Sequence, residues 1–112
     1  MTSHLTTHVL DAATGAPAVG IAVELADARG LPVDNGITDA DGRASLGPAL
    51  LADGEYTLAF RTGAYFAAQG VETFYPFVTV TFSVEVNGDG TSRHYHVPLL
   101  LSPFAYSTYR GS

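Results

Sequence analysis

Strict alternation of apolar and polar residues is the pattern that most constrains this chain. Between residues 78 and 86 every second residue is valine or phenylalanine, and threonine, serine and glutamate fill the positions between them. Successive side chains of a β-strand point to opposite faces, so this period of two predicts a strand with one buried and one solvated face. Residues 19–26 and 55–61 alternate in the same way.

Turn signals separate the alternating runs, and little of the chain has helical character. Residues 87–90, Asn-Gly-Asp-Gly, predict a hairpin that closes onto a strand beginning near Arg93. A short helix is predicted over residues 63–69, with Thr62 as its N-cap and Gly70 as its C-terminal stop. The predicted strands lie near residues 5–10, 19–28, 33–38, 42–46, 55–62, 77–86, 93–101 and 105–110.

Short strands at this spacing predict an all-β fold, an antiparallel eight-stranded β-sandwich with one short helix. At 112 residues the chain fits a single domain, residues 1–112, which can bury roughly two-thirds of its unfolded surface. It contains no cysteine, so the core is expected to hold without disulfides or thiolate-bound metal.

The charge and the hydropathy of the chain argue against two classes of partner. The formal net charge is −6, which disfavours nucleic acid and anionic membrane surfaces. No apolar run approaches the roughly 18 residues of a membrane span, and no leader pattern precedes Leu5. We therefore expect a cytoplasmic protein.

The last nineteen residues carry the densest chemistry. His94 and His96 lie two apart on a predicted strand and share a face with Pro98. The opposite face forms the better core set, Tyr95, Val97, Leu99 and Leu101. We expect both histidines to point away from the sandwich interior, and the anchored strand to hold residues 109–112 in fixed positions.

The residues alone leave several interpretations open. The two histidines are as readily explained as solvated surface groups, and His8, flanked by apolar residues, as a structural group. A metal site with His8 as a third ligand is a weaker alternative, because no acidic residue or cysteine completes the set at a familiar spacing. Arg43 near a histidine would favour the neutral imidazole that accepts a proton, but the sequence does not place it there.

Four segments carry a resemblance to a known family. They are Thr-Thr-His-Val-Leu-Asp at 6–11, Thr-Asp-Ala-Asp-Gly-Arg at 38–43, Tyr-His-Val-Pro-Leu-Leu-Leu-Ser-Pro at 95–103 and Tyr-Ser-Thr-Tyr-Arg-Gly-Ser at 106–112. The chain resembles the 5-hydroxyisourate hydrolases, a transthyretin-like family of urate degradation. The closing Tyr-Arg-Gly-Ser separates these hydrolases from the hormone-binding transthyretins. Thr7 and Ala105 depart from the family's usual serine and glycine, at positions that are not catalytic.

The resemblance implies an active site and an assembly. It implies hydrolysis of 5-hydroxyisourate to 2-oxo-4-hydroxy-4-carboxy-5-ureidoimidazoline without a metal or organic cofactor. It also implies a homotetramer, a dimer of dimers, with active sites at the interface between dimers. The implied catalytic residues are His8, Arg43, His96 and Ser112. The implied substrate-binding residues are His8, Arg43, Tyr109, Arg110 and Gly111.

The sequence leaves three alternatives to hydrolysis of 5-hydroxyisourate. A non-catalytic carrier of aromatic ligands, like the thyroid-hormone carriers, would share the fold, but those carriers lack the histidine pair and the closing tetrapeptide. A metal-dependent oxygenase could use His8, His94 and His96, which metal analysis would reveal. A purely structural sandwich would leave residues 109–112 unexplained.

Overall fold

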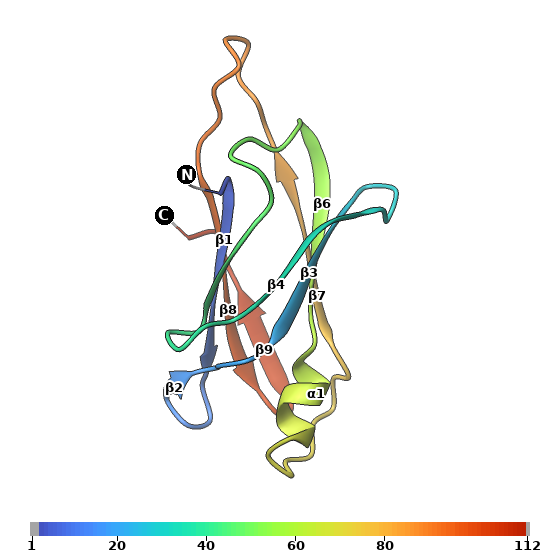
Figure 1. Cartoon of the computed structure of the whole chain (residues 1–112). Helices are drawn as coiled ribbons and strands as arrows, with labels where there is room; N and C mark the ends of the chain where they lie inside the picture. The colour runs from blue at the N-terminus through green and yellow to red at the C-terminus, as the bar shows by residue number, and fades with distance from the viewer. Residues whose placement is uncertain (1–2, 112) are drawn as a thin grey trace.

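Two β-sheets pack face to face, and one short helix lies at one end of the sandwich (Figure 1). The computed structural model describes residues 3–111. Sheet A has the order β2-β1-β8-β9, made of Ala16–Pro17, Leu5–Asp11, Tyr95–Ser102 and Ala105–Thr108, and β5, Arg43–Leu46, also pairs with β1. Sheet B has the order β4-β3-β6-β7, made of Pro32–Ile37, Ala22–Asp27, Gly54–Phe60 and Val78–Val84. The helix α1, Thr62–Ala67, follows β6.

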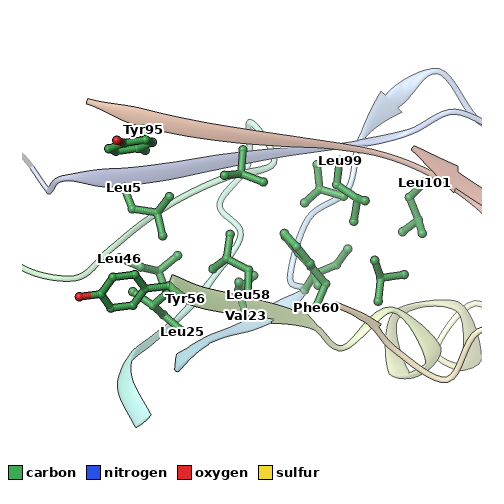
Figure 2. Packing of buried hydrophobic residues seen from close by; sticks show 14 of the residues in the cluster. Leu5, Val23, Leu25, Leu46, Tyr56, Leu58, Phe60, Tyr95, Leu99 and Leu101 are labelled. Atoms are coloured by element: carbon green, nitrogen blue, oxygen red, sulfur yellow. The ribbon is translucent and has the colours of Figure 1, made fainter. Parts of the chain in front are cut away.

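The core lies between the sheets, where the apolar halves of the alternating runs meet. Leu5 and Leu99 of sheet A point toward Leu58 and Phe60 of sheet B (Figure 2), and all four are fully buried. Burying each such side chain contributes about 1.5–3 kcal/mol. A register slip of one residue would turn this whole set toward water, so the core fixes which side chains of each strand face outward.

The predicted fold class is confirmed, and each of the eight predicted strands corresponds to a strand of the structure. The two-residue strand β2 is additional, and it is too short to produce a periodic signal. One pair departs from the antiparallel arrangement, because β1 and β8 run parallel with Leu5 opposite Tyr95 and Asp11 opposite Leu101. Parallel neighbours need a long crossover connection, and here most of the chain lies between the two strands.

The predicted hairpin at residues 87–90 is wrong in its pairing. The turn itself forms, since the Asn87 amide donates to the Thr91 carbonyl at 2.7 Å. The strands on either side do not pair, because β7 lies at the edge of sheet B and β8 lies inside sheet A. Both strands turn an apolar face into the same core, so they meet across the sandwich and the connection spans the two layers (Figure 1).

Two smaller predictions also need correction. Thr62 is the first residue of α1 and not its N-cap, which is Arg61; the Thr62 side chain is buried, and its hydroxyl makes no hydrogen bond among the described residues. The last strand ends at Thr108 and not near residue 110. In the described part of the chain no helix is long and apolar enough to cross a membrane.

Candidate active site

The outer face of sheet A carries the predicted histidines. Along β1 the buried positions are the odd-numbered ones, while Thr6 and His8 are half-buried on the opposite face. Alternation therefore places both side chains outside the core. Three strands meet at His8, because it lies opposite Arg43 of β5 on one side and Pro98 of β8 on the other.

The strand β8 presents His96 on the same face. Tyr95, Val97 and Leu99 are buried in the core, and His96 between them is half-buried on the outer face, as the sequence predicted. Pro98, which follows on that face, is buried. His96 lies opposite Thr6, one step along the sheet from the pair His8 and Pro98. On neighbouring strands such diagonal positions lie about 7–8 Å apart, within reach of aromatic side chains.

Arg43 is brought to His8 by a tight turn that only glycine permits. Gly42 has a φ of +77°, and a Cβ there would lie 2.5 Å from the Val9 carbonyl oxygen. The Asp39 carboxylate accepts hydrogen bonds from the amides of Asp41 and Arg43, at 2.8 and 3.0 Å. These bonds lower the pKa of Asp39, so the carboxylate that braces the turn stays ionised. The turn delivers Arg43 at the first position of β5.

The electrostatics of the cluster favour a neutral His96. Partial burial is the main cause that lowers the pKa of His96 below its ordinary value of about 6.5, and the positive charge of Arg43 lowers it further, followed by His8 and His94. A lowered pKa leaves the imidazole unprotonated at neutral pH. His96 is therefore able to accept a proton, which is the property a general base requires.

The C-terminal segment runs beside His96. The Gly111 amide donates to the His96 carbonyl at 2.8 Å, and a Cβ on Gly111 would lie 2.5 Å from Cδ2 of the His96 ring. Tyr109 and Arg110 are exposed, and both line a cavity that His96 also lines. Ser112, the fourth predicted catalytic residue, lies outside the described residues. The structure thus brings His8, Arg43, His96 and Gly111 together, and it places Tyr109 and Arg110 around a cavity that His96 lines.

A cavity of about 570 Å³ opens beside β8. The core-facing Tyr95 and Val97 line it together with Phe82 of β7, so it lies between the two sheets at their open edge. His96, Tyr109 and Arg110 also line this cavity, whereas His8 and Arg43 do not. The cavity and the histidine cluster therefore meet at His96.

His4 is a structural histidine. His4 is buried, its Nδ1 accepts the Leu51 amide at 2.7 Å, and its Nε2 lies 2.8 Å from the Arg93 carbonyl oxygen to which it donates. Within residues 3–111 no three histidine, aspartate or glutamate side chains gather closely enough to hold a metal ion. The trio His8, His94 and His96 thus offers no ligand cage in the described chain.

The sequence analysis missed two residues of this region. Thr6 contacts both His94 and His96 through its hydroxyl, and Asp39 braces the turn before Arg43. The signal for Thr6 was present, since a period of two places it on the same face as His8. The aspartate that opens an Asp-x-Asp-Gly turn is likewise a common acceptor of backbone amides two to four residues later.

Comparisons with known proteins agree with this architecture. The model of the HIUase/transthyretin family matches residues 5–111. The 5-hydroxyisourate hydrolase of Deinococcus radiodurans is 44% identical, with 96% of this chain and 95% of the relative covered. That of Mus musculus is 41% identical, with 98% and 96% covered.

Solved structures show the same fold in proteins with different names. Klebsiella pneumoniae 5-hydroxyisourate hydrolase superposes with a TM-score of 0.84 at 41% identity, covering 96% of this chain and 98% of that one. Sea bream transthyretin in complex with thyroxine superposes equally well, with a TM-score of 0.84, but at 34% identity, covering 96% and 93%. The resemblance predicted from four sequence segments is confirmed: this chain belongs to the HIUase/transthyretin family.

Proposed function

We propose that this protein hydrolyses 5-hydroxyisourate in urate degradation. The observation that carries the proposal is the juxtaposition of His8, Arg43 and His96 on one outward face, with His96 held neutral. Curated relatives named 5-hydroxyisourate hydrolase are 41–46% identical over nearly the full chain. Together these make the protein a hydroxyisourate hydrolase.

The reaction adds water across a ring amide. The water oxygen bonds to the ring carbonyl carbon, the carbon–nitrogen bond breaks, and the nitrogen takes up a proton, which leaves a carboxylate and opens the ring. The step needs a positioned water, a base that takes the water's proton, and a positive group near the oxyanion that develops. No metal or organic cofactor enters this scheme.

The geometry suggests a role for each residue of the cluster. His96, neutral at working pH, takes the proton of the water, with His8 beside it to orient the water and the substrate. General-base assistance of this kind contributes roughly 10²–10⁴-fold. Arg43 adds to the effect of burial in keeping His96 neutral, and it faces the developing oxyanion. Gly111 lets the chain pass directly against the His96 ring.

The other residues of the closing motif enter the proposal by resemblance. Tyr109 and Arg110 are exposed, and Tyr109 shows 58% of its surface, so both are available to a substrate or to a neighbouring subunit. Ser112 is proposed to position water or substrate through its hydroxyl or its terminal carboxylate. A variant that lacks Ser112 tests this role directly.

We also propose that the protein assembles as a homotetramer with its active sites between dimers. In the described chain neither β7 nor β9 has a second strand partner, and unpaired edges of this kind commonly pair with another copy. Phe104 and Tyr106, near the edge strand β9, expose 60% and 40% of their surface. The expected mass is four times the 11.7 kDa of the chain, measurable by light scattering. A cytoplasmic location stays a prediction.

The rival function is non-catalytic binding of an aromatic ligand. It is favoured by the equal superposition on a transthyretin with bound thyroxine. It is disfavoured by the lower identity, 34% against 44% for the Deinococcus hydrolase, and by the histidine pair, which a passive carrier does not require.

The test is the decay of 5-hydroxyisourate, generated from urate by urate oxidase and followed by ultraviolet absorbance. The intact protein is expected to accelerate the decay, and His96→Ala and Arg43→Ala to lose most of that rate. Arg29→Ala removes an arginine from an exposed turn outside the site and serves as the matched control for Arg43→Ala. Decay at the spontaneous rate with the intact protein would overturn the proposed function.

A further inference from the structure

One hydroxyl lies between two histidines on the outer face of sheet A. The Thr6 Oγ1 is 2.8 Å from Nε2 of His94 and 2.8 Å from Nδ1 of His96. The parallel register explains the contact, since Thr6 lies opposite His96 and His94 precedes it by two residues on the same side. Neither Thr6 nor His94 has a role in the mechanism above.

Proton counting restricts this arrangement. A threonine hydroxyl has one proton to donate and can accept two hydrogen bonds. If both ring nitrogens that face Thr6 were unprotonated, only one of them could accept the hydroxyl proton. The other contact would then have no proton to form a hydrogen bond. At least one of the two histidines therefore carries its own proton on the nitrogen that faces Thr6.

The direction of the hydrogen bond between Thr6 and His96 decides which nitrogen of His96 can accept a proton. When neutral His96 holds its proton on Nδ1, it donates to Thr6 and its Nε2 remains unprotonated, and the Thr6 hydroxyl is then free to donate to Nε2 of His94. When Thr6 instead donates to Nδ1 of His96, the neutral ring carries its proton on Nε2 and cannot take another there. The hydrogen bond that one ring nitrogen makes thus sets what the other can do.

We propose that Thr6 and His94 are positioning residues that hold His96 with its proton on Nδ1, so that Nε2 is free to take the proton of the attacking water. The direction of these hydrogen bonds rests on the proposed function, because hydrolysis needs an unprotonated Nε2 on His96. The groups near His96 include Thr6 and His8 from β1, Arg43 from β5 and His94 just before β8, and Tyr109 and Arg110 line a cavity with it.

Conservative variants separate a positioning role from a packing role. Thr6→Val keeps the shape of the side chain and removes the hydroxyl, whereas Thr6→Ser keeps the hydroxyl. His94→Gln keeps an acceptor near the Thr6 hydroxyl, whereas His94→Leu removes it. We expect Thr6→Val and His94→Leu to lower kcat roughly tenfold with KM little changed, the equivalent of about one hydrogen bond. Thr6→Ser and His94→Gln are expected to restore the rate to within about threefold.

The decisive readout is the tautomer itself, measured on protein with ¹⁵N-labelled histidine by long-range ¹H–¹⁵N NMR above pH 7. We expect a bare Nε2 and a protonated Nδ1 for His96 in the intact protein and in Thr6→Ser, and a shift toward protonated Nε2 in Thr6→Val. Thermal unfolding verifies that each variant is folded. A protonated Nε2 in the intact protein, or a tautomer that Thr6→Val leaves unchanged, would overturn the proposal. Because this readout needs no substrate, failure to hydrolyse 5-hydroxyisourate would refute the proposed function separately.

Discussion

Replacing Gly111 by alanine is the substitution that most directly probes the site geometry. A Cβ at this position would lie 2.5 Å from Cδ2, 3.1 Å from Cγ and 3.2 Å from Cβ of His96. The backbone angle of Gly111 is not in the left-handed region, so alanine is tolerated conformationally and the cost is steric. The conflict falls on the ring that we propose as the general base.

The size of the effect follows from these distances. Carbon atoms in ordinary contact lie about 3.5–4.0 Å apart, so the ring or the chain segment must move by roughly 1 Å to relieve the shortest contact. A displacement of about 1 Å between catalytic groups costs on the order of 10²-fold in rate. We therefore expect Gly111→Ala to lower kcat/KM for 5-hydroxyisourate by about 10²-fold.

Gly88→Ala is the matched control for this experiment. Gly88 lies in the loop between β7 and β8, where a Cβ would meet nothing within 4 Å. Both variants are compared by initial rates of 5-hydroxyisourate decay and by thermal unfolding. Gly88→Ala is expected to retain the rate of the intact protein. A Gly111→Ala variant that is folded and within twofold of the intact protein would refute the placement of Gly111 against the working histidine.

Two further substitutions test the electrostatics and the packing. Arg43→Ala removes a cation that lowers the pKa of His96, so that pKa is expected to rise. Less neutral base is then present at a given acidic pH, and the acidic limb of the kcat/KM profile moves to higher pH. An acidic limb that stays in place while only KM increases would contradict this role. Thr38→Val removes a buried hydroxyl that accepts the Ile21 amide at 2.9 Å and donates to the Ala18 carbonyl at 2.7 Å. We expect it to lower the free energy of unfolding by about 1–3 kcal/mol in urea titrations, and a loss below about 0.5 kcal/mol would contradict the reasoning.

The strands were predictable because each of them buries one face. Alternation along residues 78–86 is a local property of the chain, and the core it implies is the core observed. The pairing of strands was less predictable. A tight turn at 87–90 suggests a hairpin locally, but the burial of β7 and β8 in opposite layers depends on the whole sandwich. The parallel contact of β1 with β8 is likewise a tertiary property with no local signal.

The candidate site was likewise predictable from the sequence only in part. Period two correctly placed His96 outside the core, and this needed no knowledge of any relative. It could not show that His8 lies between Arg43 and Pro98, because those neighbours come from strands far away in sequence. The resemblance supplied that grouping, and the register of β1 with β5 and β8 gives it a physical basis. The bridging contact of Thr6 requires the same register and was visible only in the structure.

The fold by itself does not distinguish an enzyme from a protein that only binds a ligand. A hydrolase and a hormone-binding transthyretin superpose on this chain with the same TM-score, 0.84. Function in such a case depends on the side chains that the common fold presents. Here the outward face of sheet A presents two histidines and an arginine, and partial burial, helped by the charge of Arg43, lowers the pKa of His96 and keeps its imidazole neutral.

A double-mutant cycle between His8 and His96 tests the central claim most directly, which is that the two histidines act together on one water and one substrate. The kcat/KM for 5-hydroxyisourate is measured for the intact protein, His8→Ala, His96→Ala and the double variant. Residues that act as a unit are strongly non-additive, so the double variant is expected to lose little more than the worse single variant. Losses that multiply across the two positions, or single variants with the full rate, would contradict the account.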